Sequence, residues 1–409
     1  MINAVFLIVI FFCLIRWFYH TVIVLAIWWQ VLQNLYFPPY SFTGICTAMI
    51  GLCLIFKLMK REIVWKNFPL RKAFIFLFIC YGISVVNGVL NLGNILRVLG
   101  IFVIPISSFF AIQKIGKFWN FLFLNILIYA IIILSVGFVE LYCGFNPIIL
   151  WLQSVGVGDY SSEQREDYIR FGMYRCQSLL VWCSTYGVTC GLTAVLLLLL
   201  NFYKRVKYSL VLIIFAILLL FGMFTSGTRS VYMAICICML AYVFQAAFKF
   251  KYLVAVLLLF IGAYFMYSDF FDQVLLSFID TSSVGGSDTE LRISQFNITM
   301  NEFLKNPLIG NGEGRCAALV DRNIGLLGAE SFIYWTLIDR GMMGVAGTLF
   351  LLYSTLKYVM RYNVLLCFIP LGIMVGKYMS LFPHIDETYY FFYLFILLRA
   401  YREYSVSYK

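Results

Sequence analysis

The apolar run at residues 119–141 decides the class of fold, and it reads WNFLFLNILIYAIIILSVGFVEL. Its only charged residue, Glu140, stands next to its end. A helix rises about 1.5 Å per residue, so a run of this length can cross a hydrocarbon core of roughly 30 Å. The run therefore predicts a transmembrane helix.

Similar runs recur along the whole chain, which has 409 residues and is 63% hydrophobic, 19% aromatic and 12% charged. This composition excludes a soluble domain and predicts an all-α, polytopic helical membrane protein, with residues 1–409 forming a single membrane domain. The other runs long enough to span a bilayer lie at 42–59, 71–87, 94–112, 177–201, 208–226, 230–247, 251–268, 330–356, 363–382 and 388–401.

The first 36 residues leave two interpretations open. They form either one span with an interfacial segment or two short spans broken between Arg16 and His20. The chain is thus expected to have about 12 transmembrane helices, or about 13 in the second case. No basic segment precedes the first apolar run and no small-residue cleavage signal follows it, so we expect no removable signal peptide.

Basic residues cluster on alternate loops, which the positive-inside rule places in the cytoplasm. The net charge of +11 is therefore mostly a topology signal, and it favours a lipid bilayer rather than nucleic acid as the partner. The clusters are Lys57, Lys60, Arg61, Lys66, Arg71 and Lys72; Lys114 and Lys117; Lys204, Arg205 and Lys207; Lys249 and Lys251; Lys357 and Arg361; and Arg399 and Arg402.

The opposite, exoplasmic side receives two longer loops, at 143–175 and 269–329. The second loop carries eight acidic and four basic residues, so we expect it to be solvated. Within it, the apolar residues of 291–304 recur at steps of three and four, which predicts an amphipathic helix lying over the bundle. These apolar residues are Ile293, Phe296, Met300 and Leu304.

Most of the twelve cysteines lie inside apolar runs, where a thiol behaves as a small hydrophobe. Cys143 and Cys176 bracket the first long loop, which leaves a disulfide between them open. No zinc-binding spacing occurs, and we expect no metal site.

Five arginines lie at or near the exoplasmic face, and a planar guanidinium suits bidentate binding of phosphate oxygens. Arg229 follows a short hairpin between two apolar runs, where the alternative is an interfacial arginine that reaches lipid headgroups or caps a helix. The five are Arg175, Arg229, Arg292, Arg315 and Arg322.

The glycine-rich stretch at 306–314 reads NPLIGNGEG. Backbone N–H groups around Gly310 and Gly312 could form an anion nest, although the stretch matches neither the P-loop nor the dinucleotide fingerprint, and a plain connector is the alternative. The later glycines Gly341, Gly344 and Gly347 are more typical of a helix-packing stripe.

Glu330 begins an apolar helix on the same face. A carboxylate there can simply cap the helix, because the free N–H groups and the helix dipole stabilise it. Partial burial near lipid would instead raise its pKa and make it a usable general base. The sequence leaves both roles open.

These motifs follow one another in an order that resembles the O-antigen ligase and Wzy-type O-antigen polymerase superfamily of the bacterial inner membrane. The motifs cover residues 140–356, and hydropathy alone extends the resemblance further. Arg175 and Gly191 are also separated by fifteen residues, similar to the Arg-x15-Gly pattern of Wzy polymerases, whereas Arg292 lacks a glycine at that spacing. The ordered motifs are SGTR at 226–229, LRISQF at 291–296, NPLIGNG at 306–312, Glu330-Ser331, and GMMG at 341–344.

The resemblance implies roles for particular residues. Arg229 and Arg292 match the arginines assigned to the pyrophosphate of a polyprenyl-linked donor. Glu330 stands where ligases carry a histidine, which favours a polymerase and leaves open whether Glu330 is the base or only positions the acceptor. Asp288 and Glu290 are second-choice bases or substrate contacts, and further substrate contacts are expected from Arg175, Arg315, Arg322, Gly310 and Gly312.

The implied reaction joins lipid-linked repeat units into O-antigen or a related polysaccharide at the periplasmic face of the inner membrane. Undecaprenyl-pyrophosphate-linked glycan is both donor and acceptor, no cofactor is needed, and a chain-length regulator protein is an expected partner. An O-antigen ligase is the alternative within the enzyme class. A flippase for lipid-linked oligosaccharides is the alternative from another class, although the chain shows no internal repeat and few charges inside its spans.

Overall fold

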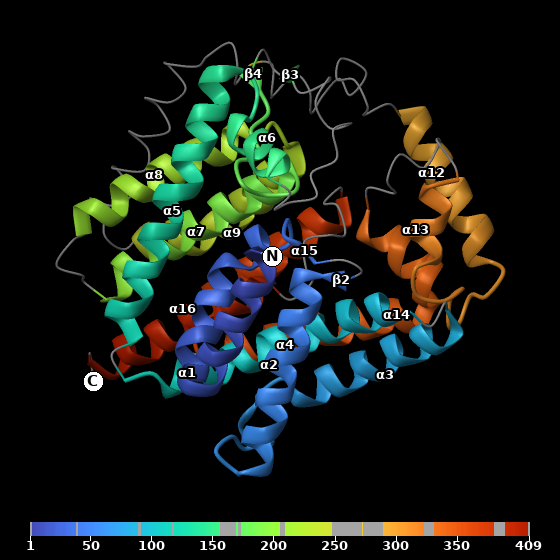
Figure 1. Ribbon diagram of the computed structural model, residues 1–409, viewed down its shortest axis with the longest axis horizontal. Helices are drawn as coiled ribbons and strands as arrows, with labels where there is room; N and C mark the ends of the chain where they lie inside the picture. The colour runs from blue at the N-terminus through green and yellow to red at the C-terminus, as the bar shows by residue number, and fades with distance from the viewer. Residues whose placement is uncertain are drawn as a thin grey trace.

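The computed structural model describes residues 2–37, 40–88, 91–116, 118–155, 169–170, 173–204, 209–247, 272, 289–322, 331–379 and 389–407. This part of the chain is helical apart from two antiparallel pairs of two-residue strands (Figure 1). Strand β1 (Tyr36–Phe37) pairs with β2 (Tyr40–Ser41), and β3 (Ile169–Arg170) pairs with β4 (Met173–Tyr174).

The helices of the described residues follow in chain order. They are α1 (Ile2–Leu32), α2 (Phe42–Met59), η1 (Trp65–Asn67), α3 (Arg71–Asn87), α4 (Leu92–Lys114), α5 (Phe118–Cys143), α6 (Pro147–Ser154), α7 (Cys183–Lys204), α8 (Ser209–Thr225), α9 (Arg229–Ala247), α12 (Thr289–Phe303), α13 (Arg315–Val320), α14 (Phe332–Met360), η5 (Val364–Cys367), α15 (Phe368–Met379) and α16 (Tyr389–Ser407).

Seven of these helices, α1, α2, α4, α5, α7, α9 and α14, are long and apolar enough to cross a bilayer, so the chain is a helical membrane protein. The predicted runs at 42–59 and 71–87 coincide with α2 and α3 residue for residue. The predicted span at 251–268 lies outside the described residues, and the total of 12 stays a prediction.

At the N-terminus, residues 2–32 form one helical run, α1, with a single break. Trp17, inside the expected Arg16–His20 interruption, has the non-helical angles φ −133° and ψ 49°. Downstream, polar side chains fix where helices begin, because they accept hydrogen bonds from otherwise unpaired N–H groups. Ser41, Asn91 and Ser331 cap α2, α4 and α14 in this way.

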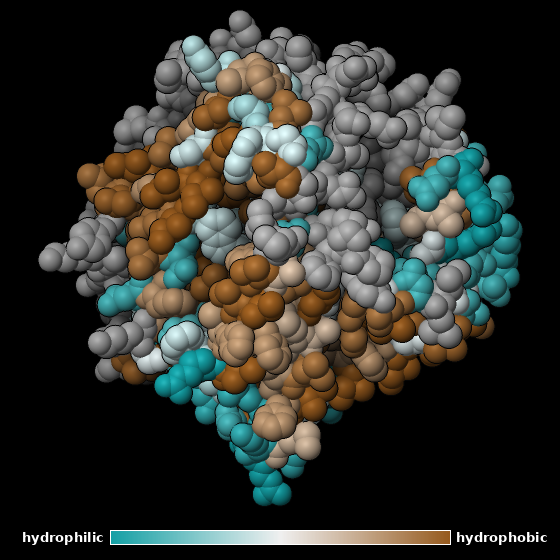
Figure 2. Space-filling model, viewed as in Figure 1, coloured by the Kyte–Doolittle hydropathy of each residue, from teal (hydrophilic) through white to brown (hydrophobic). Residues whose placement is uncertain are grey.

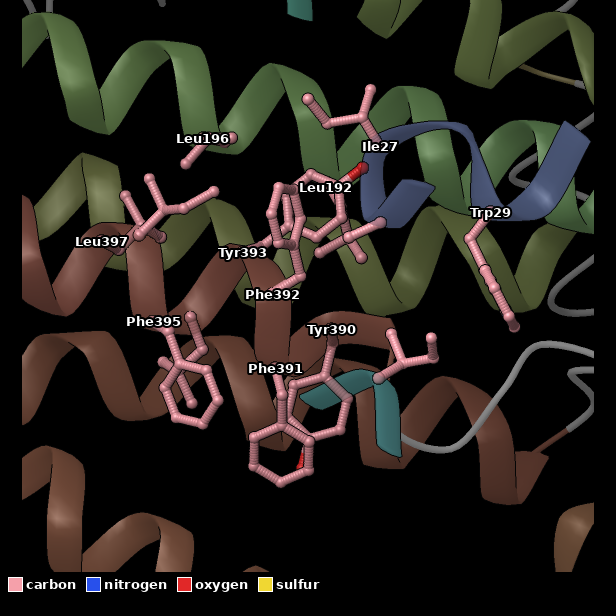
Figure 3. Close-up of a cluster of buried hydrophobic side chains, with 14 of the residues drawn as sticks. Ile27, Trp29, Leu192, Leu196, Tyr390, Phe391, Phe392, Tyr393, Phe395 and Leu397 are labelled. Carbon is pink, nitrogen blue, oxygen red and sulfur yellow. The ribbon is translucent and has the colours of Figure 1, made fainter. Parts of the chain in front are cut away.

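The core is centred on α7, which is almost completely buried and packs against α8, α9 and α16. Figure 3 shows its Leu192 beside Tyr393 of α16 and its Leu196 beside Leu397, with Ile27 of α1 nearby. Glycine lets α7 and α9 approach closely, since a Cβ on Gly191 would collide with the Ile235 side chain. Gly191 thus lies on a small-residue packing face of α7.

Helix α12 forms where the sequence predicts a helix, and it packs against α14 with several apolar side chains exposed. Ile293, Phe296 and Leu304 are more than half exposed, whereas Gln295 and Thr299 are completely buried. In a membrane protein an apolar face can turn toward lipid, so burial does not have to follow hydrophobicity. Figure 2 shows α12 and α13 forming a mixed polar and apolar surface at the right of the molecule.

The two cysteines that bracket the first long loop are not joined. Cys143 is exposed at the end of α5, and Cys176 is buried with its thiol 3.5 Å from the Gly137 carbonyl oxygen. Burial raises the pKa of the Cys176 thiol well above its usual range, which makes it unreactive.

Candidate functional site

The glycine-rich stretch at 306–314 packs between α3 and α14, which Figure 1 shows side by side. Its N–H groups are taken up by backbone carbonyls: Asn311 donates to Ile338 (2.8 Å), Gly312 to Asp339 (3.1 Å) and Glu313 to Ser84 (3.0 Å). These donors point into the protein. The anion-nest interpretation of Gly310 and Gly312 is therefore wrong for this conformation, and the stretch is a packed junction.

A break in α14 makes room for this junction. Gly341 has φ +59° and ψ −155°, angles that favour glycine strongly. The N–H groups just after the break leave the helix and donate to the junction, Met342 to the Pro307 carbonyl (2.9 Å) and Met343 to the Leu308 carbonyl (3.0 Å). Further along α14, Gly347 packs against Leu77 and Cys80 of α3, which confirms a helix-packing role for it.

The junction carries one buried carboxylate that ties three segments together. Glu313, 1% exposed, accepts two hydrogen bonds from Arg340 of α14, at 3.1 and 3.0 Å, and another from Arg97 of α4. The Arg340 guanidinium also stacks on the Tyr81 ring of α3, 3.8 Å from its centroid. Burial opposes the charge on Glu313, but Arg340 and Arg97 outweigh it and hold the pKa of Glu313 below its ordinary value.

A second buried carboxylate, Asp339, supports the turn into α13. It accepts hydrogen bonds from the Gly314 N–H (3.2 Å) and the Cys316 N–H (2.7 Å). The Ser84 hydroxyl donates to the Asp339 carbonyl oxygen at 2.8 Å. Asp339 and Arg340 directly precede the break at Gly341, and both side chains contact residues 313–316.

Beside this cluster lies a cavity of about 360 Å³. Arg97 and Arg340 form its charged wall, and Trp29, Trp335 and Phe332 are aromatic residues that line it. Hydroxyl groups at the start of α2, from Ser41, Thr43 and Thr47, line it as well. A concave site that combines aromatic surface with a few polar groups is typical of small-molecule binding.

The cavity lies where the charge pattern predicts the exoplasmic ends of the helices. Its lining residues belong to the end of α1, the starts of α2 and α4, and the segment before α7. The start of α14 completes it, beginning two residues after Glu330. The basic residues at 57–72 stand at the other end of α2, and Figure 2 shows that tip as hydrophilic.

Arg175 and Arg229 are far apart in the sequence but both lie at the short turn between α8 and α9, residues 226–228. The Arg175 guanidinium donates to the Ser226 carbonyl (3.2 Å) and the Thr228 hydroxyl (3.2 Å), and Arg229 is the first residue of α9. Gly227, with φ +62°, sits directly under the Arg175 side chain. Two predicted site residues are thus brought together at one helix start.

The remaining predicted residues are spread along the second long loop. Arg292 is half-buried on α12, and Arg322 is exposed just after α13. Arg315 begins α13 and forms an ion pair with Glu302, at 3.0 Å. Glu330 and Asp288 lie outside the described residues, as does the side chain of Glu290.

Sequence reasoning missed Arg97, Glu313 and Arg340 as members of the site. A signal was present, because Arg97 and Arg340 are charges inside predicted spans, and such charges mark functional or paired positions by default. The partner of each could not be read from the sequence, since Glu313 is 216 residues from Arg97.

No cluster of three or more potential metal ligands occurs among the described residues.

Comparison of the chain with protein-family profiles, curated proteins and solved structures finds no match.

Proposed function

We propose that this protein polymerises lipid-linked oligosaccharide repeat units, with undecaprenyl pyrophosphate as the leaving group, at the periplasmic face of a bacterial inner membrane. The order of its motifs, similar to that of Wzy-type polymerases, suggests the reaction. The observation that carries the proposal is the cavity at the predicted exoplasmic ends, which combines guanidinium, aromatic and hydroxyl groups and is lined by Phe332, two residues after Glu330 in the sequence. Sugar and phosphate both need groups of these kinds.

In the proposed reaction, a hydroxyl of the acceptor glycan attacks the anomeric carbon of the donor glycan. The bond from that carbon to the pyrophosphate oxygen breaks, and the lipid pyrophosphate leaves with the bonding electrons. Glu330 accepts the hydroxyl proton or orients the hydroxyl. Arg229 and Arg292 neutralise the charge on the leaving group, as the resemblance implies.

The proposed topology has 12 spans with the C-terminus in the cytoplasm. The end of α16 carries Arg399 and Arg402, a basic pair of the kind that the positive-inside rule assigns to that side. A protein that regulates chain length is a proposed partner.

Deletion of the gene in its host, followed by sizing of the surface polysaccharide on a gel, tests this function. A polymerase deletion leaves single repeat units on the lipid acceptor. Loss of all attached polymer while lipid-linked chains accumulate would indicate the ligase. Repeat units trapped on the cytoplasmic side would indicate the flippase, and an unchanged ladder would contradict all three.

Complementation with single variants tests the site. We expect Arg229→Ala, Arg292→Ala and Glu330→Ala each to lose long-chain polymer while the protein stays at normal levels in the membrane. Arg61→Ala is the control, because Arg61 is exposed beyond the far end of α2 and should leave the ladder unchanged. Normal ladders in all three site variants would reject the assignment.

A further inference from the structure

The cavity presents aromatic side chains from separate helices, Trp29 from α1 and Phe332 and Trp335 from α14. The C–H faces of a sugar ring pack well on aromatic surfaces, whereas its hydroxyls need hydrogen-bond partners. The start of α2 supplies such partners through Ser41 and Thr43. The lining therefore suits a saccharide better than a purely apolar ligand.

The two arginines of the cavity are not equivalent. Arg340 is held at three points, by both carboxylate oxygens of Glu313 and by the Tyr81 ring, and its side chain is only 7% exposed. Arg97 shares the Glu313 carboxylate through one nitrogen, Nη2, and its side chain is 40% exposed. Arg97 is thus the guanidinium that a ligand in the cavity can reach.

The charge around the cavity favours an anionic group. A third cation, Lys377 of α15, is buried behind the wall, with its nitrogen 5.3 Å from the centroid of the Phe332 ring. Among the described residues, the wall and the residues behind it bring together the cations Arg97, Arg340 and Lys377 and the carboxylates Glu313 and Asp339. Of these cations, Arg97 lines the cavity with its side chain partly exposed, so an opposite charge that enters the cavity is attracted to it.

We propose that the cavity binds an acidic sugar of the glycan, with the carboxylate of the sugar on Arg97 and its ring against the aromatic wall. This inference rests on the proposed function and names the substrate class of the same site. Because the cavity adjoins the start of α14, the bound sugar is proposed to be the terminal residue of the acceptor. Arg97 then determines specificity, and Arg340 positions Glu313.

Binding of free sugars to the purified protein tests the inference without a lipid-linked donor. Tryptophan fluorescence is the readout, because Trp29 and Trp335 line the cavity. The probes are glucuronate, glucose and inorganic phosphate. A hydrogen bond between charged groups contributes about 1.5 kcal/mol or more, so glucuronate should bind at least roughly tenfold more tightly than glucose. Phosphate should bind more weakly than glucuronate.

Substitutions at Arg97 identify the source of that preference. Arg97→Gln should reduce the preference for glucuronate over glucose to about twofold or less, and Arg97→Lys should retain part of it because the charge remains. Arg61→Gln, at the far end of α2, should bind both sugars as the unchanged protein does. Thermal denaturation checks the folding of each variant, and the Lys variant alone decides the matter if the Gln variant does not fold.

Three results would overturn the inference: equal binding of glucose and glucuronate, no saturable response to glucuronate, or phosphate binding as tightly as glucuronate. The last result would indicate a bare anion site. If glucuronate is not preferred but gene deletion still abolishes long-chain polymer, only the cavity assignment is rejected. The opposite combination is a glucuronate preference of the purified protein that depends on Arg97, together with an unchanged polymer ladder after gene deletion. That combination would reject the polymerase function and keep the cavity assignment.

Discussion

At the scale of single residues, Glu313 is the side chain on which the charged cluster depends. One carboxylate, almost fully buried, binds guanidinium groups from α4 and α14. A buried charge is tolerated only when it is paired and hydrogen-bonded. Removing one member of this cluster would leave the charge of its partner uncompensated and lower the stability of the fold.

Glu313→Gln should therefore destabilise the protein by about 3 kcal/mol, because two guanidinium groups lose their counter-charge while the shape of the side chain is kept. The midpoint of thermal denaturation in detergent measures the effect. Glu62→Gln is a matched control, since Glu62 forms an ion pair with Lys57 at an exposed site and such pairs contribute little. Equal midpoints for the two variants would contradict the role given to Glu313.

The same residue predicts how stability depends on pH. The pKa of Glu313 in the folded protein lies below its ordinary value of 4.5, because Arg340 and Arg97 outweigh the effect of burial. Its contribution is therefore complete above about pH 4.5 and is lost as the pH falls through the lowered value. Glu302, paired with Lys305 and Arg315, contributes in the same direction.

Denaturation midpoints measured between pH 7 and pH 3 should show this acid limb, and Glu313→Gln should flatten it. An acid limb of unchanged steepness in the variant would mean that other carboxylates cause the loss of stability.

At the scale of elements, the break in α14 joins the glycine-rich junction to the charged cluster. Helix α14 leaves its regular path at Gly341, and the freed N–H groups bind the backbone at Pro307 and Leu308. The junction and the break therefore depend on each other, because the N–H groups freed by the break hydrogen-bond to carbonyl groups of the junction.

Gly341→Ala should destabilise the protein by about 3 kcal/mol, because a Cβ there would lie 2.6 Å from the Gly310 nitrogen and 2.7 Å from the Pro307 oxygen. Gly82→Ala in α3 is the matched control, since a Cβ there meets nothing within 4 Å. We expect that control to stay within about 1 kcal/mol of the unchanged protein. Similar denaturation midpoints for both variants would show that the backbone tolerates the change.

At the scale of the whole molecule, the contacts gather several helix ends at one place. At the end of α3, the Ser84 carbonyl accepts a hydrogen bond from the Glu313 N–H and the Asn87 amide donates to the Gly310 carbonyl, and the cavity gathers the neighbouring ends of α1, α2, α4 and α14. All of these ends are predicted to be exoplasmic from the basic residues alone. The packing brings together helix ends that the charge pattern predicts to lie on one face.

Labelling in spheroplasts with a membrane-impermeant maleimide tests this orientation. Native Cys143 is exposed at the predicted outer face and should be labelled, and Cys143→Ser should remove that signal. In the Cys143→Ser background, Asn306→Cys should be labelled from outside, whereas Glu62→Cys should be labelled only after permeabilisation. The reverse pattern would invert the topology and place the cavity in the cytoplasm.

The sequence by itself determined the class of fold and the position of the seven long apolar helices. It could do so because a bilayer requires long apolar helices, a property that is local and visible in any window of about 20 residues. Its predictions for 42–59 and 71–87 matched α2 and α3, and it placed a helix at 291–304.

Only the tertiary structure decided what those polar residues contact. It turned the apolar side of α12 outward, used the N–H groups of 310–313 within the protein, and paired Glu313 with Arg97 and Arg340. The physical reason is that pairing depends on which helix ends meet in space. Hydropathy specifies that a segment lies in the membrane, whereas its neighbours there are set by packing and by the need of each buried charge for a partner.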